Sequence, residues 1–350
     1  MKFKSAGALV SAAFLTAGLS GCATNSGASG GAAKAEADNA GKPIVYTSTD
    51  VWASVAKAVT GDLAEVKTSI DQPNQDPHSY EVSVKDKQLV NDASVVIVNG
   101  GGYDDWAIQL ADSAKAKPAV LNAVEISGID CETAEEDAHE HGDDEEHAGE
   151  TDEHDHENEA TEKNDDHAED AHAGHHHCAV NEHVFYDLDT VSDVAEKLAE
   201  SLGKTDKTNA KAYRTNAKAF EAKLDALEEK ADAIEERGEK HSLATEPLAN
   251  YLLEDAGVHD ITPAAYVEQS ETESGPSVKT QAETKALLTQ GKVDVLLVNA
   301  QTEDPVSKAL QDEAKAKGIP LVTMNETLAG ASDYVSWIGD ALDQLDAALK

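Results

Sequence analysis

Residues 94–99 read SVVIVN, and residues 293–299 read VDVLLVN. Both are short, almost continuous apolar runs, which is typical of parallel strands that are buried on both faces. Around each run, short apolar segments alternate with longer segments in which apolar residues recur at helical spacing. This alternation predicts an α/β fold, with helices covering both faces of a parallel sheet.

The pattern repeats on either side of a long helical region, which predicts two lobes. We expect strands at residues 43–47, 66–70, 94–99 and 119–121 in the first half and at 242–244, 293–299 and 321–324 in the second. We expect helices at residues 50–59, 82–90, 103–114 and 189–202, from Pro247, from Pro305, and at 334–349.

Residues 207–237 form the longest predicted helix, about 30 residues and roughly 45 Å at the helical rise. Its large apolar side chains share one stripe (Tyr213, Phe220, Leu224, Leu227 and Ile234), so we expect it to pack along a globular body. The predicted organisation is a signal peptide (1–22), a flexible tether (23–42), an N-terminal lobe (43–187), linking helices (188–238) and a C-terminal lobe (239–350).

The N-terminus carries the pattern of an exported protein. Lys2 and Lys4 precede an apolar run, residues 6–19, that is too short to span a bilayer and fits a secretory signal. The run ends in LSGC (residues 19–22), which resembles the bacterial lipobox and predicts a lipid anchor on Cys22. The alternative is a plain secretory signal with an incidental cysteine. Either way we expect the protein outside the cytoplasm, and the lipobox would hold it at the cell membrane.

Residues 131–178 are strongly acidic and rich in histidine, with 20 acidic residues, one lysine and ten of the 14 histidines of the chain. Few large apolar side chains are present to offset the ordering entropy, so we predict a disordered loop inside the N-terminal lobe. Interleaved imidazoles and carboxylates favour an auxiliary metal-binding role over a solvated linker or a tag. The histidines concerned are His139, His141, His147, His154, His156, His167, His172, His175, His176 and His177.

Cys131 and Cys178 flank this acidic tract. In an oxidising compartment the two would form a disulfide at the base of the loop. The alternative is that both sulfurs bind metal.

Several function classes are not supported by the sequence. A formal net charge of −40 argues against nucleic-acid binding. No phosphate-binding glycine loop, nucleophile elbow or HExxH motif is present, since Gly100, Gly101 and Gly102 lack the GxGxxG spacing.

Polar residues follow three predicted strands or their neighbouring turns, and a fourth follows the acidic tract. His78 lies in DPHSYE (76–81), His183 in NEHVFYD (181–187), Glu246 in TEP (245–247) and Glu326 in NET (325–327). Ligands of parallel α/β sheets bind beyond the carboxyl ends of the strands, where two imidazoles and two carboxylates would form a closed metal site. Each residue alone has a structural alternative: a helix-terminal charge for a glutamate, a structural role for a histidine.

The pair of histidine motifs, with the acidic insertion before the second, resembles the cluster A-I substrate-binding proteins. These metal-binding lipoproteins serve ABC importers for zinc and manganese. The resemblance covers residues 43–350 and implies two α/β lobes joined by a long rigid helix, with the metal between them and a membrane permease as partner. It also implies His78, His183 and Glu246 as ligands, with Glu326 at a fourth position where the family usually has aspartate.

Two other sources of ligands compete with this set. Residues 299–304 (NAQTED) offer further oxygens near the fourth position. His241 and His259 are close in sequence to Glu246, but His241 precedes its predicted strand and so should lie at the opposite end.

We expect Zn²⁺ because of the histidine-rich tract, with Mn²⁺ as the alternative because glutamate oxygens suit that ion. The expected function is capture of the ion by a monomer and its delivery to the importer. An enzyme is not expected, because four protein ligands would leave no open coordination position. A role as a surface adhesin stays open.

Overall fold

A computed structural model describes residues 41–73, 75–129, 181–270 and 274–350. Cys22, Cys131, Cys178 and the ten histidines of the acidic tract lie outside the described residues. Residues Lys42–Lys350 form one compact unit. None of the helices in the described ranges has the length and apolar character needed to cross a bilayer.

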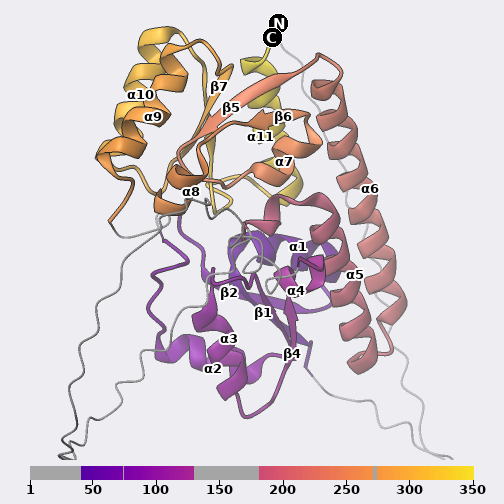
Figure 1. Ribbon diagram of the computed structural model, residues 1–350. Coiled ribbons are helices and arrows are strands. Elements are labelled where there is room, and N and C mark those ends of the chain that lie inside the picture. Colours follow the sequence, from indigo (N-terminus) through magenta and orange to yellow (C-terminus); the bar gives the residue numbers. More distant parts are fainter. Residues whose placement is uncertain (1–40, 74, 130–180, 271–273) are drawn as a thin grey trace, which may run out of the picture. The chain divides into compact units, whose positions relative to one another are not determined.

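The N-terminal lobe, in indigo and purple in Figure 1, is built on a parallel four-stranded sheet. Its strand order is β2-β1-β3-β4. The strands are β1 (Ile44–Thr49), β2 (Glu65–Ile70), β3 (Val95–Val98) and β4 (Ala119–Asn122). The helices are α1 (Asp50–Thr60), α2 (Val84–Asp92), α3 (Asp105–Ser113) and α4 (Ala123–Ser127).

The C-terminal lobe repeats this architecture, with the order β6-β5-β7-β8 and all pairs parallel. The strands are β5 (Lys240–Ala244), β6 (Val258–Asp260), β7 (Val295–Asn299) and β8 (Leu321–Met324). The helices are α7 (Asn250–Asp255), α8 (Ala264–Ser270), α9 (Val278–Thr289), α10 (Pro305–Lys317) and α11 (Tyr334–Ala348).

Strand β3 shows why the apolar runs form buried strands. All four of its residues are buried, and successive side chains enter different cores. Val95 and Ile97 belong to the core shared with α1 and α5, whereas Val96 and Val98 pack against residues of α2 and α3. Because both faces are covered, the strand is apolar throughout, and the prediction of a doubly covered parallel sheet is confirmed.

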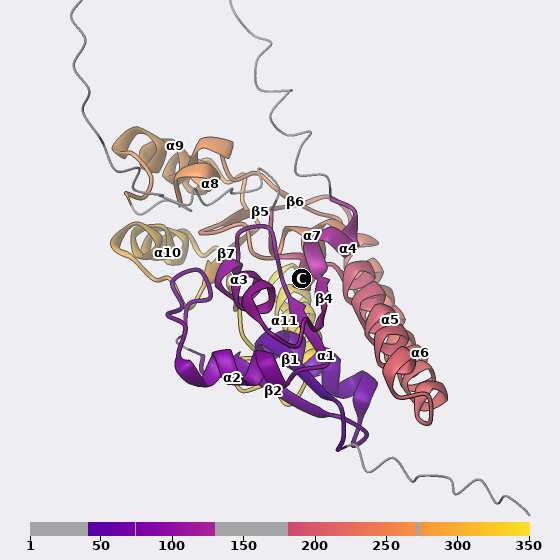
Figure 2. The ribbon, with the colours of Figure 1, turned by 90° about the horizontal axis from the view of Figure 1, so that it is seen from below.

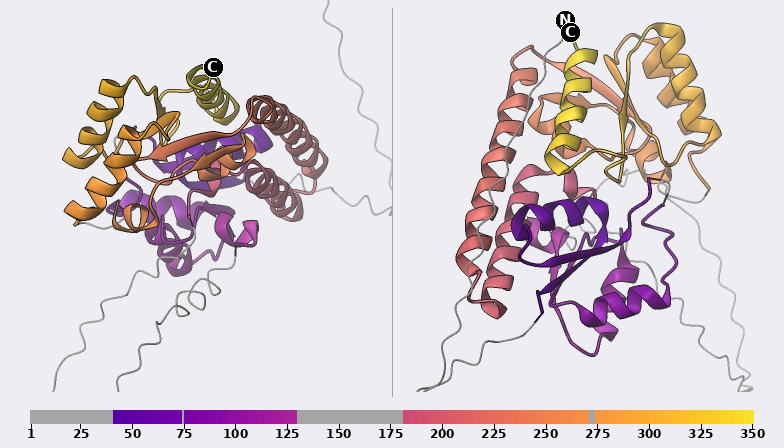
Figure 3. Two further views of the ribbon diagram at one scale, coloured as in Figure 1. Left: turned by 45° about the horizontal axis from the view of Figure 1, so that its top comes forward. Right: turned by 180° about the vertical axis from the view of Figure 1, so that it is seen from behind.

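Two helices connect the lobes: α5 (Leu188–Thr205) and α6 (Ala210–Glu235). They lie side by side, and α6 runs along both lobes (Figures 1 and 2). All five residues of the predicted α6 stripe are buried. The helix contacts α1 of the N-terminal lobe and also α7 and α11 of the C-terminal lobe, as the rear view in Figure 3 shows for α11. One continuous apolar core therefore includes residues of both lobes.

Buried hydrogen bonds reinforce the junction of the lobes. The hydroxyl of Tyr334 donates to the carbonyl of Phe185 at 2.7 Å, and the Tyr334 amide donates to Ser54 at 2.7 Å. The hydroxyl of Tyr186 donates to the carbonyl of Asn325 at 2.9 Å, and its ring centroid lies 4.9 Å from that of Trp337. These contacts oppose any rotation of one lobe against the other.

Some elements differ from the sequence-based expectation. The helix predicted from Pro247 begins at Asn250, because residues 245–249 are held by tertiary hydrogen bonds, including one from the Asn181 side-chain amide to the Pro247 carbonyl. Strand β6 and the helices α4, α8 and α9 were not predicted, nor was a short 3₁₀ helix at Val184–Tyr186. These elements are short or, like α9, lack a clear apolar stripe.

The shared core generates a prediction about cooperativity. Leu224→Ala in α6 should lower the free energy of unfolding by about 2–5 kcal/mol, because Leu224 is 1% exposed and its removal leaves a cavity. Urea denaturation followed by fluorescence and by far-UV circular dichroism should show a single coincident transition for both lobes. The control Glu221→Ala, on the exposed face of α6, should change the free energy by no more than about 0.5 kcal/mol. Two separated transitions would contradict the shared core.

Candidate metal centre

A cleft of about 410 Å³ opens between the carboxyl ends of the two sheets. Residues of both lobes line it, including all four predicted ligands (Asp76, His78, Glu182, His183, Thr245, Glu246, Thr302 and Glu326, among others). His78 lies in the loop after β2, Glu246 is the second residue after β5, and Glu326 is the second residue after β8. His183 immediately precedes the 3₁₀ helix.

Three of these residues form a compact donor group. His78, His183 and Glu326 each offer a ligand atom, and those atoms all lie within 4.8 Å of one another. The Nε2 atom of His78 lies 4.0 Å from Oε2 of Glu326, and the two imidazole centroids are 6.4 Å apart. Among the residues that the structure describes, no other trio of histidine, cysteine or carboxylate donors is as close.

His183 is held in the orientation that a ligand needs. Its Nδ1 lies 2.7 Å from Oδ1 of Asn181, and because an amide oxygen only accepts hydrogen bonds, Nδ1 carries the proton. The lone pair is therefore on Nε2, which remains available to a metal. Burial, together with the proximity of His78, lowers the pKa of His183 to about 3, so this imidazole stays neutral and ready to ligate.

Glu326 is a buried carboxylate with one unsatisfied oxygen. The residue is 3% exposed, and its Oε1 accepts a hydrogen bond of 2.8 Å from the Asn299 amide. The other oxygen, Oε2, is buried and has no hydrogen bond of good geometry among the described residues. Burial raises the pKa of Glu326 to about 7, with a smaller contribution from the charge of Glu246. The buried hydroxyl of Tyr103, which also lacks such a partner, is close enough to act on this carboxylate and lowers the pKa of Glu326 slightly. A cation beside Oε2 would satisfy this oxygen and favour the ionised form.

Two further residues of the centre were not predicted. The carboxylate of Glu182 lies 3.9 Å from Nε2 of His78, and burial raises the pKa of Glu182 to about 7. Its position beside His183 in the NEHVFYD motif was the available signal. The ring of Tyr103 is fully buried and meets His78 edge-on, with the centroids 4.8 Å apart. No feature of the sequence distinguished Tyr103 from an ordinary core aromatic.

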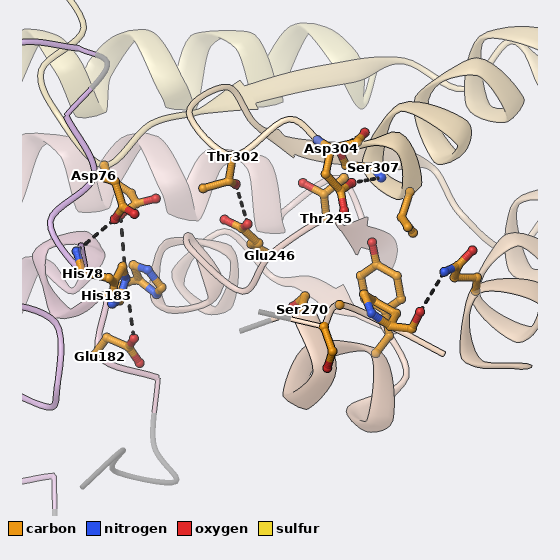
Figure 4. Close-up of a pocket in the computed structure, with 17 residues that line it drawn as sticks. Asp76, His78, Glu182, His183, Thr245, Glu246, Ser270, Thr302, Asp304 and Ser307 are labelled. Atoms are coloured by element: carbon orange, nitrogen blue, oxygen red, sulfur yellow. Dashed lines mark hydrogen bonds and ion pairs between the residues drawn. The ribbon is translucent and has the colours of Figure 1, made fainter. Parts of the chain in front are cut away.

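Glu246 lies in the same cleft but outside the three-residue donor group. In Figure 4 it stands beside Thr302, apart from His78, His183 and Glu182. Its two oxygens accept hydrogen bonds from the Asn299 amide and the Thr302 hydroxyl. To reach an ion held by the donor group, Glu246 would have to leave Thr302.

Residues 299–304 offer competing oxygen ligands, but two of them have other roles. The side-chain nitrogen of Asn299 donates to both Glu246 and Glu326, so Asn299 ties these two carboxylates together. The carboxylate of Asp304 accepts from the Ser307 amide and caps the N-terminus of α10.

His241 and His259 do not belong to this cleft. His241 is near the start of β5, whereas Glu246 follows the end of that strand, and His259 is paired with His241 on β6. Both histidines therefore lie at the opposite edge of the C-terminal sheet, as predicted for His241.

Comparison with known proteins agrees with this architecture. The sequence model of the family described as zinc-uptake complex component A, periplasmic (ZnuA), matches residues 45–348. The manganese-binding lipoprotein MntA of Halalkalibacterium halodurans is 33% identical over 90 residues, which is 26% of this chain and 28% of MntA. The alignment thus spans little more than a quarter of that relative.

Solved structures with similar folds include three metal-binding proteins. A crystal structure of ZnuA has a TM-score of 0.63 at 16% identity, covering 89% of this chain and 100% of that one. The periplasmic zinc-binding protein TroA from Treponema pallidum has a TM-score of 0.61 at 18% identity, covering 88% and 99%. FpvC from Pseudomonas aeruginosa in complex with Mn²⁺ has a TM-score of 0.61 at 21% identity, covering 88% and 98%. At these identities the likeness establishes the fold.

The raised carboxyl pKa values predict that ion binding depends on pH near neutrality. Below pH 7 Glu326 is protonated in the metal-free protein, so an incoming cation must displace that proton. Affinity for Zn²⁺ should therefore fall on going from pH 8 to pH 6, by up to about tenfold per pH unit for each displaced proton. Dye-competition titration of a chain lacking residues 132–177 would measure the Zn²⁺ affinity at each pH. Glu182→Gln should keep most of this dependence, and an affinity that is unchanged between pH 8 and pH 6 would refute the prediction.

Proposed function

The chain belongs to the family of the periplasmic zinc-uptake component A, metal-binding proteins of ABC importers, and we propose that it captures one Zn²⁺ ion in the cleft and delivers it to the importer's membrane permease. The observation that carries this proposal is the donor group of His78, His183 and Glu326, in which a buried carboxylate oxygen without a hydrogen bond faces an imidazole.

The donor set fits Zn²⁺. Zinc binds imidazole nitrogen and carboxylate oxygen at roughly 2.0–2.2 Å in a tetrahedron, which places neighbouring ligand atoms roughly 3.3 Å apart. The three donor atoms lie within 4.8 Å of one another, so shifts on the order of 1–2 Å in side chains and loops would bring them to bonding distance. No swing of the lobes is needed.

We assign the fourth ligand to Glu246. Its carboxylate lines the same cleft and is linked to Glu326 through Asn299. Exchange of the exposed Thr302 hydroxyl for a cation would replace a neutral hydrogen bond by a metal–oxygen bond. With four protein ligands the ion has no open position for a substrate or a reactive water, which suits a cargo site better than a catalytic one.

Mn²⁺ is the second candidate cargo. Three glutamates line the cleft (Glu182, Glu246 and Glu326), and an oxygen-rich site favours Mn²⁺ over softer ions. Two buried or partly buried imidazoles weigh toward Zn²⁺. The two ions are distinguished by measuring the affinities for both on the same protein.

Parts of the chain outside the described residues complete the proposal. We assign to the tract 131–178 the role of an auxiliary zinc collector, with its base closed by a Cys131–Cys178 disulfide. We assign the membrane anchor to a lipid on Cys22 and expect the protein to act as a monomer. The support for these assignments is the sequence pattern.

Loss of a ligand should abolish tight binding. On a background lacking residues 132–177, which removes the ten competing histidines, calorimetry should show that His78→Ala, His183→Ala and Glu326→Ala each weaken Zn²⁺ affinity by more than about 100-fold, because alanine supplies no ligand atom in place of the imidazole or carboxylate. Glu246→Ala should have a similar effect if it is the fourth ligand. Gln281→Ala, which changes a cleft residue outside the donor group, is the control and should bind as the parent does. Wild-type affinity in both histidine variants would overturn the proposed function.

The anchor is tested separately. Cys22→Ala should leave an uncleaved precursor or release the protein from the membrane, since the thioether-linked lipid would supply the attachment. Membrane fractionation together with mass spectrometry of the N-terminal peptide would measure this. An unchanged mass and an unchanged membrane fraction would show that Cys22 carries no lipid.

A further inference from the structure

Two strands of the C-terminal sheet and the residue just before a third place metal-binding side chains in one row at the edge opposite the cleft. His241 of β5 pairs in register with His259 of β6. On the other side of β5, Ser242 pairs with Val295, which sets Asp294 opposite His241, and the Asp294 amide donates to the His241 carbonyl at 2.8 Å. The row His259–His241–Asp294 therefore runs from β6 across β5 to the residue just before β7.

The three side chains project from the same face of the sheet. Alternate residues of a strand share a face. Leu243 and Leu296, each two residues after a member of the row, both belong to the core that packs against α9 and α10. His241 and Asp294 therefore point to that side, and the in-register pairing puts His259 there too. Neighbouring strands are about 4.8 Å apart, a spacing at which side chains in register are close enough to share one ion.

The side chains already interact across the row. The imidazole centroids of His241 and His259 are 6.1 Å apart. Nδ1 of His241 lies 4.0 Å from Oδ2 of Asp294, and its Nε2 lies 3.5 Å from a carboxylate oxygen of Glu239. Asp294 is fixed by a 2.8 Å hydrogen bond from the His241 amide. The His241 side chain is 35% exposed and that of Glu239 is 71% exposed, so their rotamers can adjust at little cost.

We propose that His241 and His259 form a second site for a divalent transition-metal ion such as Zn²⁺, completed by carboxylate oxygens of Asp294 and Glu239. Two imidazoles with carboxylates are a donor set that suits Zn²⁺ and disfavours Mg²⁺ and Ca²⁺, which take oxygen ligands. Asp294 and Glu239 lie beside different nitrogens of His241, so binding requires that the two rings turn toward a common point and that the exposed Glu239 side chain move with them. The ion would bridge β5 and its short edge strand β6, so it would stabilise the pairing of that strand.

This second site is separate from the cargo site. It lies at the amino ends of β5 and β6, whereas Glu246 and Glu326 follow the carboxyl ends of β5 and β8. It shares no residue with the cleft, and the proposed transport function does not depend on it.

Chemical footprinting of the full chain tests the site residue by residue. Diethyl pyrocarbonate acylates unligated neutral imidazoles, and mass spectrometry locates the modified histidines. With increasing Zn²⁺, His241 and His259 should lose reactivity together, with one common midpoint. His259→Ala should raise the midpoint for His241 by at least about tenfold, because a chelating pair becomes a single ligand, and Asp294→Asn should raise it several-fold. Mg²⁺ in place of Zn²⁺ should give no protection.

The matched control is Asp312→Asn, which removes an exposed carboxylate from α10 and should leave the midpoint unchanged. Undiminished acylation of either histidine across the whole zinc titration would refute the site. So would a midpoint for His241 that does not respond to His259→Ala, since His241 would then be an isolated ion-paired imidazole. Either result leaves the assignment of the cleft ligands untouched.

Discussion

The packing of α6 against both lobes is the constraint on which the rest of the structure depends. Its apolar stripe closes a core that begins in the N-terminal sheet and ends at α11. Separating or rotating the lobes would expose part of this core and break buried hydrogen bonds such as that from Tyr334 to Phe185. Because apolar burial is the main favourable term in folding, the free energy of ion binding cannot readily drive such a motion. The cleft must therefore be close to its binding geometry before the ion arrives.

A preformed cleft lowers the stability of the metal-free state. Glu326 is buried with one oxygen that lacks a hydrogen bond, and its raised pKa measures how poorly the surroundings support its charge. Neighbouring amides reduce the freedom of the ligands in this state. Asn181 fixes the tautomer of His183, and Asn299 holds Glu326 beside Glu246. The buried carboxylate of Glu326 thus destabilises the empty cleft, while the amides of Asn181 and Asn299 hold the candidate ligands in place for a cation.

The sequence predicted the order of strands and helices well wherever the signal was local. Apolar runs such as 94–99 and the stripe of α6 depend on spacing within one segment, and their burial follows directly. The meeting of His78 and Glu326 in one cleft could be predicted because the carboxyl ends of parallel strands share one edge, whereas His183 follows the acidic tract and was predicted from its motif. The bonding of Glu246 to Asn299 and Thr302 could not, because those contacts join residues more than 50 positions apart. Strand β6 was not predicted because its three residues are too few to show an alternating pattern.

The rigid junction of the lobes has a consequence for how occupancy can be recognised. Since the outer faces of both lobes are fixed by one core, they present the same shape whether the cleft is empty or filled. A partner protein that docks on those faces alone would accept either form, and empty molecules would compete with loaded ones for the same surface. Selection of the loaded form must therefore rest on contacts at the rim of the cleft, where the proposed ligand set would have Glu246 exchange the Thr302 hydroxyl for the ion.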